Sequence, residues 1–157
     1  MELILTDISK SFDNQRVLSS LNFTFKKNCV YGLIGNNGSG KTTLLKIISG
    51  LLVQDKGQIN LSHNVLNKIT SYIDNNRRSF FLRLTAYENL IYFGALNNLR
   101  KDEVTQLLEQ YSNYINTSFI DRAVNELSVG QVQILNIIRG LMKKPKIIIF
   151  DEALSTL

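Results

Sequence analysis

Residues 35–42 of this 157-residue chain read Gly35-Asn36-Asn37-Gly38-Ser39-Gly40-Lys41-Thr42, and this stretch decides the fold. It fits the pattern G-x-x-x-x-G-K-[ST], a glycine-rich loop that cradles phosphate groups. Glycines let the backbone curl so that successive amides point inward, and the following helix adds the positive end of its dipole. The pattern places Lys41 to reach the β- and γ-phosphates and Thr42 to ligate Mg²⁺. The sequence therefore predicts a site for a nucleoside triphosphate.

The segments on either side of this loop agree with that interpretation. Residues 29–34 before it, Cys-Val-Tyr-Gly-Leu-Ile, are predicted to form a short buried strand. Residues 43–49 after it are predicted to form a helix whose apolar face consists of Leu44, Ile47, Ile48 and Leu51. A glycine-rich turn that matches the motif by chance would require neither flank, so the phosphate-binding interpretation is favoured.

A second apolar run, Ile147–Phe150, ends in the two carboxylates Asp151 and Glu152. Four consecutive apolar residues suit a strand of a parallel sheet that is buried on both faces. Carboxylates that follow such a strand lie in the crevice where open α/β sheets bind ligands. We expect Asp151 to contact Mg²⁺ through water and Glu152 to polarise a water for attack on the γ-phosphate. A strand followed by an acidic turn is the alternative, and the phosphate-binding loop makes it the weaker one.

The segment Leu127-Ser128-Val129-Gly130-Gln131 precedes a helical pattern from Val132 to Met142. It resembles the L-S-G-G-Q signature of the ATP-binding cassette (ABC) family, with Val129 in place of one glycine. In that family the segment binds the γ-phosphate of the nucleotide held by the opposite protomer. The residues themselves allow Ser128 to cap a helix whose amides and dipole attract an anion. A plain helix cap is the alternative.

The resemblance extends along nearly the whole chain. Residues 1–25 resemble the opening antiparallel strands of the family, with apolar alternation at Leu3, Leu5, Leu21, Phe23 and Phe25. Phe12 occupies the position of the aromatic residue that stacks on adenine, and Val17 that of the apolar residue beside it. The alternative for Phe12 is an ordinary hydrophobic anchor between strands.

Residues 69–73 are predicted to form another strand, and Asn75-Asn76 follow where the family carries its glutamine loop. That loop supplies a Mg²⁺ ligand and senses the membrane partner, and the family spacing favours Asn76 for this role. Asparagine offers the same carbonyl on a shorter side chain, so a bridging water is the expected form of contact.

A helical subdomain is expected at about residues 80–125, because the run from Arg83 to Leu90 resembles the start of that subdomain in the family. Thr85 and Glu88 form a capping-box pattern. Helical patterns follow at Ala86–Asn97 and Lys101–Tyr111. Their apolar residues suit either a core or a partner-docking face; these are Leu90, Phe93, Leu96, Val104, Leu107 and Leu108.

Together, these inferences define one composite site for ATP and Mg²⁺. The expected nucleotide contacts are Phe12, Val17, Gly35, Asn36, Asn37, Gly38, Ser39, Gly40, Lys41, Thr42, Thr43, Ser128, Gly130 and Gln131. The expected catalytic residues are Lys41 and Glu152, and the expected metal contacts are Thr42, Asn76 and Asp151.

Composition bounds the remaining possibilities. With 44% hydrophobic residues, one globular domain over residues 1–157 is expected, and no apolar run is long enough to cross a bilayer. The net charge of +5 is scattered rather than interleaved with aromatic residues, which argues against a nucleic-acid partner. Cys29 is predicted to be a small buried hydrophobe, and His63 a surface residue between strands.

The chain reaches Leu157 without the coupling Asp, the later strands and the switch histidine that the family carries. We therefore expect an incomplete cassette, or a piece whose fold a partner completes, with an unpaired sheet edge. The resemblance implies an α/β ATPase domain that pairs with a second nucleotide-binding domain and powers a membrane permease from the cytoplasmic side. The isolated chain is expected to hydrolyse ATP negligibly. The alternatives are a non-catalytic fragment and a soluble ABC ATPase that acts on nucleic acid or ribosomes.

Overall fold

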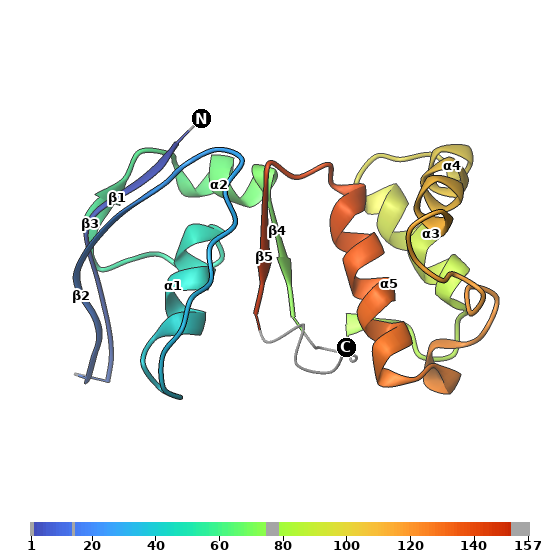
Figure 1. Ribbon diagram of the computed structural model, residues 1–157, viewed down its shortest axis with the longest axis horizontal. Coiled ribbons are helices and arrows are strands. Elements are labelled where there is room, and N and C mark those ends of the chain that lie inside the picture. Colours follow the sequence, from blue (N-terminus) through green and yellow to red (C-terminus); the bar gives the residue numbers. More distant parts are fainter. Residues whose placement is uncertain (1, 14, 75–78, 152–157) are drawn as a thin grey trace. The chain divides into compact units, whose positions relative to one another are not determined.

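The computed structural model describes residues 2–13, 15–74 and 79–151 (Figure 1). Contacts divide the chain into two compact units, Met1–Thr70 and Ser71–Leu157. Across the described residues, no helix combines the length and the apolar character that crossing a membrane requires.

The first unit contains an antiparallel sheet. Its strands lie in the order β2-β1-β3, with β1 at Leu3–Phe12, β2 at Gln15–Phe25 and β3 at Lys56–Ile59. Leu5 pairs with Phe23 on β2 and with Ile59 on β3. Leu3 and Leu5 are buried because alternate side chains of β1 face the core, and the register shift between Leu5 and Ile8 brings Ile8 into the core as well. The predicted opening antiparallel strands are therefore confirmed.

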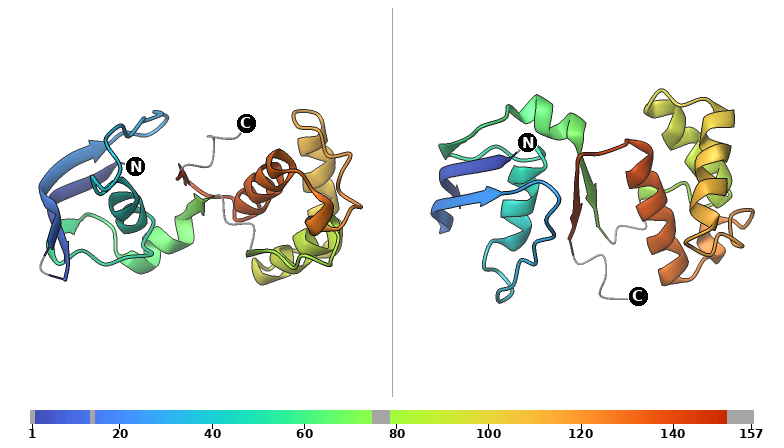
Figure 2. Two further views of the ribbon diagram at one scale, coloured as in Figure 1. Left: turned by 90° about the horizontal axis from the view of Figure 1, so that it is seen from below. Right: turned by 45° about the horizontal axis from the view of Figure 1, so that its top comes forward.

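Helix α1 (Lys41–Ile48) lies on one side of this sheet (Figure 2). Leu44, Ile47 and Ile48 are buried, as the apolar pattern predicts. Leu51 is 56% exposed, so its predicted place on the buried face is wrong. The reason is that the helix ends early: the Leu51 amide donates back to the carbonyl oxygen of Lys46 (2.9 Å) and the Gly50 amide to that of Ile47 (3.1 Å). This Schellman arrangement turns the chain out of the helical period.

Helix α2 (His63–Ile69) begins at a residue that the sequence placed between strands. The hydroxyl oxygen of Ser62 caps it by accepting from the Val65 amide. His63 is half-buried, and its Nε2 lies 3.0 Å from Oε1 of Gln54. His63 lies between the strands at residues 56–59 and 70–73, as predicted, but it begins a helix and is half-buried, so the prediction of a surface residue is wrong.

Residues 29–34 do not form the predicted buried strand. Val30 and Ile34 are almost fully exposed, and Cys29 is exposed as well, so its predicted burial is also wrong. A strand needs a hydrogen-bonded neighbour. Neither sheet formed by the described residues includes this segment. Val30 and Ile34 therefore gain no burial from a sheet, whereas the Tyr31 ring packs edge-on against Phe23 and Phe25 of β2.

The second unit combines a two-stranded sheet with helices. Its elements are β4 (Thr70–Ile73), α3 (Ala86–Leu96), α4 (Lys101–Ser112), a 3-10 turn at Val124–Glu126, α5 (Val129–Met142) and β5 (Ile147–Phe150). The paired strands β4 and β5 run in the same direction, and α5 lies between them and the α3–α4 pair (Figure 1). The strands predicted at residues 69–73 and 147–150 are therefore present.

Strand β5 is buried on one face only. Ile149 is 6% exposed, whereas Ile148 and Phe150 are exposed. The prediction of burial on both faces is therefore wrong, because two of the four side chains of the strand are exposed.

The helices of this unit share a hydrophobic core. Leu90, Val104 and Leu108 are buried in it, and Phe93 and Leu107 pack against it. Leu96 is 64% exposed. The apolar residues of these two helices were expected to form either a core or a partner-docking face. The core interpretation is confirmed for all of them except Leu96.

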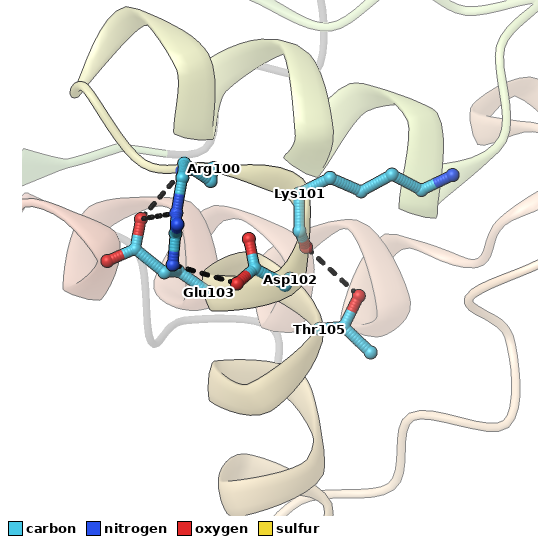
Figure 3. A network of polar contacts seen from close by, with 5 residues as sticks. All are labelled: Arg100, Lys101, Asp102, Glu103 and Thr105. Atoms are coloured by element: carbon cyan, nitrogen blue, oxygen red, sulfur yellow. Dashed lines mark hydrogen bonds and ion pairs between the residues drawn. The ribbon is translucent and has the colours of Figure 1, made fainter.

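Local capping sets the starts of α3 and α4. The predicted capping box is present: the Glu88 amide donates to Oγ1 of Thr85 (3.1 Å), and the Thr85 amide to Oε2 of Glu88 (2.8 Å). At α4 the Arg100 amide donates to Oε2 of Glu103 (2.8 Å), and the Arg100 guanidinium reaches Asp102 (2.9 Å) (Figure 3). The acidic side chains in this first turn also complement the helix dipole.

Candidate nucleotide-binding site

The glycine-rich loop has the backbone that the motif requires. Gly38 and Gly40 lie in the left-handed region, at φ 79° and 90°. A Cβ on Gly40 would lie 3.0 Å from the carbonyl oxygen of Val17 and from the Leu18 side chain. Any side chain here would therefore be strained by both the conformation and its neighbours. The loop closes against β2 only because this position is glycine.

Lys41 folds back over this loop. Its Nζ donates to the carbonyl oxygens of Gly35 (2.7 Å) and Asn36 (2.9 Å). The ammonium group is thereby held within the loop, at the N-terminus of α1. A helix N-terminus, curled glycine-rich backbone and a lysine ammonium together make a phosphate site. The residues fit a bound phosphate chain, and Thr42 in the first turn adds a hydroxyl suited to Mg²⁺.

Phe12 and Val17 belong to the same unit as the loop. Val17 is half-buried on β2, and a Cβ on Gly40 would lie 3.0 Å from its Cγ1, so it packs against the loop as expected of a residue at the site. Phe12 ends β1 with its ring 45% exposed and the Lys10 ammonium 5.4 Å from the ring centroid. An exposed ring contributes little to a core, which favours a contact role; stacking on adenine stays a prediction.

The signature segment begins helix α5. Oγ of Ser128 accepts from the Gln131 amide (3.2 Å), and the Ser128 amide donates to Oε1 of Gln131 (3.0 Å). The predicted cap is therefore confirmed, and it is a reciprocal capping box. Val129 is exposed, and a Cβ on Gly130 would meet no atom within 4 Å, so this turn presents an open surface. Contact between this turn and a second protomer's nucleotide stays a prediction.

Asp151 follows β5 directly. Its amide donates to the carbonyl oxygen of Ile73 on β4 (2.9 Å), so the strand pair fixes its backbone. Its carboxylate accepts a hydrogen bond from the Tyr72 hydroxyl, a contact that the sequence did not predict. Glu152 and Asn76, the predicted base and metal-loop residue, lie outside the described residues.

Two polar residues of α5 bind the chain on both sides of residues 75–78. Nδ2 of Asn136 donates to the carbonyl oxygen of Asp74 (3.1 Å), and Nη1 of Arg139 donates to Oγ of Ser79 (2.9 Å). The Arg139 guanidinium also lies over the Phe80 ring, 4.4 Å from its centroid. Burial lowers the pKa of Arg139, while the charge of Asp74 acts in the opposite direction. The sequence contains a pattern from which a role for these two residues could have been predicted. Two polar side chains three positions apart on a largely apolar helix need hydrogen-bond partners.

The comparisons with known proteins agree with these features. A family model described as "ABC transporter" matches residues 18–155. The structure of CbiO1 from Clostridium perfringens, described as part of the ABC transporter complex CbiONQ, is similar at a TM-score of 0.84 and 22% identity. That match covers 99% of this chain and 66% of the CbiO1 chain, so this chain spans just under two thirds of its length.

A second structure shows the same fold. The ADP conformation of MJ1267, an ATP-binding cassette of an ABC transporter, matches at a TM-score of 0.82 and 25% identity, over 100% of this chain and 71% of that one. The predicted α/β fold with N-terminal antiparallel strands is confirmed by both structures. Because the family model matches most of the sequence, the chain belongs to the ABC transporter family.

Proposed function

We propose that this chain is the nucleotide-binding part of an ABC transporter ATPase and holds MgATP at the loop that precedes α1. The observation that carries this proposal is the placement of Lys41, whose ammonium group lies on the carbonyls of Gly35 and Asn36 at a helix N-terminus. A nucleotide phosphate can replace these two carbonyl oxygens as the acceptor for the ammonium group. The loop need not rearrange, because the positive charge already lies there.

The proposed roles follow the chemistry of each side chain. The loop amides and Lys41 bind the β- and γ-phosphates, and Phe12 with Val17 contacts the base. Thr42 holds Mg²⁺, Asp151 and Asn76 reach it through water, and Glu152 polarises the attacking water. The metal would neutralise charge on the phosphates, and the protein would supply the orientation.

We further propose that the chain works as one nucleotide-binding domain with its helical subdomain at about residues 80–125. Ser128, Gly130 and Gln131 would bind the nucleotide of a second domain, because they lie at the exposed start of α5. A membrane-embedded permease is the other proposed partner, with the chain on the cytoplasmic face of the membrane. The CbiO1 structure supports such an assembly, since that protein is described as part of a transporter complex. Exposed apolar side chains suit a docking face on the second unit: Phe81, Leu82, Leu84, Tyr92 and Leu96.

Thermal unfolding with and without MgATP tests nucleotide binding. A ligand that binds only the folded state at a hundredfold excess over its Kd stabilises that state by about 2.7 kcal/mol, which raises the melting temperature. Lys41→Ala should abolish most of this increase. Lys46→Ala is the matched control, because Lys46 is exposed in the last turn of the same helix. Equal stabilisation of wild type and Lys41→Ala would show that the phosphate site is misassigned.

Closure with a second domain requires its own experiment. Where the full fold of the cassette is available, Glu152→Gln should accumulate a dimer in the presence of ATP, because hydrolysis would no longer separate the two domains. Adding Ser128→Arg should prevent the dimer by placing a bulky side chain at the start of α5. Light scattering that reports one unchanged mass in every case would contradict the dimer.

A further inference from the structure

We propose that Tyr72 is the positioning residue for Asp151: its hydroxyl holds the Asp151 carboxylate in the orientation in which it contacts Mg²⁺ through water. This inference rests on the proposed MgATP site. It adds to that site a residue that belongs to none of the sequence motifs described above.

The first step in the argument is that the strand ladder orients the backbone of Asp151 but not its carboxylate. The Asp151 amide is bound to the carbonyl oxygen of Ile73 at 2.9 Å. Two side-chain torsions still separate that backbone from the carboxylate oxygens. The hydroxyl of Tyr72, one residue before Ile73 on β4, donates to Oδ2 and so restricts both torsions.

The second step is that Tyr72 is itself held by a rigid element. On one side of it, the Ser71 hydroxyl donates to the carbonyl oxygen of Gly140 on α5 at 2.5 Å. On the other side, Ile73 packs so closely on Gly140 that a Cβ there would lie 2.8 Å from its Cδ1. Both neighbours therefore bind α5, and since strand side chains alternate, Tyr72 extends from the opposite face of β4.

The third step concerns what the hydroxyl does for a metal. Carboxylates that serve magnesium are oriented by groups in the outer shell, and loss of such a group typically costs about 10- to 100-fold in metal affinity. A tyrosine is suited to this task, because its rigid ring has few torsions and its hydroxyl donates to the carboxylate. Through Ser71 and Ile73, the same contact links the carboxylate to α5, the helix that Ser128 begins.

The test compares Tyr72→Phe with Tyr87→Phe. Each change removes one tyrosine hydroxyl from a half-buried ring, and the Tyr87 hydroxyl lies 3.0 Å from Oγ1 of Thr105, within the helical part of the same unit. The first readout is the carboxyl ¹³C signal of Asp151 in aspartate-labelled protein, assigned with Asp151→Asn. It should move in Tyr72→Phe and stay in place in Tyr87→Phe, with or without nucleotide.

The second readout is ATP binding as a function of Mg²⁺ concentration. Tyr72→Phe should raise the half-saturating Mg²⁺ concentration about tenfold, the lower end of the outer-shell range because water mediates the contact. ATP binding in EDTA should be unchanged, and Tyr87→Phe should match wild type in both conditions.

Three results would overturn the inference. An unchanged Asp151 signal in Tyr72→Phe would show that the Tyr72 hydroxyl does not bind this carboxylate in solution. An equal change in Mg²⁺ dependence in both variants would show a general loss of stability, and no change in Tyr72→Phe would show that the hydroxyl does not serve the metal. Failure of the proposed function can be distinguished from failure of this inference, since wild type itself would then show no Mg²⁺-dependent binding of ATP. In that case the proposed magnesium role of Tyr72 would also be wrong.

Discussion

Residues 29–34 and strand β5 are two short apolar runs of similar composition, and they differ in their surroundings. β5 pairs with β4, and its Ile149 is buried. Residues 29–34 lie in neither sheet of the described chain, and Val30 and Ile34 are almost fully exposed. Each run lies next to residues of the proposed site, Gly35 in one case and Asp151 in the other.

This difference shows that an apolar run becomes a strand only where another strand and a covering layer are present. The backbone of an extended segment without a neighbouring strand has no ladder to join. Within residues 29–34, Tyr31 packs on Phe23 and Phe25 of β2, while Val30 and Ile34 stay exposed. The loop at residues 35–40 nevertheless keeps its conformation, because glycines, the Lys41 contacts and the packing of Val17 determine it locally.

The largest expected effect comes from the same substitution in the two runs. Ile149→Ala removes a side chain that is 6% exposed and should cost about 2–5 kcal/mol of stability, the usual range for a buried isoleucine. Ile34→Ala, at 96% exposure, should change stability by less than about 0.5 kcal/mol. Urea denaturation followed by circular dichroism measures both. A cost for Ile34→Ala close to that for Ile149→Ala would show that residues 29–34 are buried in solution.

A glycine pair separates the loop from the segment before it. Gly40→Ala should cost about 1–2 kcal/mol, because alanine is strained at φ 90°. Gly32→Ala should be nearly neutral, since a Cβ there would meet no atom within 4 Å. The same denaturation curves report both changes. If Gly32→Ala were the more damaging of the two, the open surroundings of residues 29–34 would be wrong.

The start of α5 provides a case that depends on local structure alone. Ser128→Ala removes the cap and should cost about 1 kcal/mol. Ser118→Ala, at an exposed serine of the same unit, is the control and should have little effect. Hydrogen exchange of the first-turn amides of α5 should increase in Ser128→Ala only. Unchanged exchange there would mean that tertiary packing, rather than the cap, holds this helix start.

The smallest expected effect concerns the residue that begins the exposed segment. Cys29→Ser should change stability by less than about 0.5 kcal/mol, because Cys29 is exposed. In the wild-type chain, maleimide should label this thiol at close to the rate measured in urea. Labelling that becomes much faster in urea would indicate that something covers Cys29 in the folded chain.

Several features of the fold and site were predictable because neighbouring residues determine them. The caps at Thr85 and Ser128 each need only a residue three positions later, and both are present. The antiparallel hairpin of β1 and β2 follows from apolar alternation on either side of a short connection. Leu51 was misplaced because the helix period was extended past Ile48, where the Schellman hydrogen bonds end it.

Features that depend on distant residues were not predictable in the same way. Tyr72 and Asp151 are 79 positions apart, and only the pairing of β4 with β5 brings hydroxyl and carboxylate together. Asn136 and Asp74 are 62 positions apart, and the packing of α5 joins them. No local pattern contains either partnership.

The sequence by itself determined the phosphate-binding loop, the helix caps and the family, because each depends on residues that are close along the chain and on their fixed spacing. The tertiary structure alone decided which apolar runs are strands, which of their faces are buried and which side chain orients Asp151. The physical reason is that ladder hydrogen bonds and burial are properties of pairs of segments, and a single segment does not contain its partner.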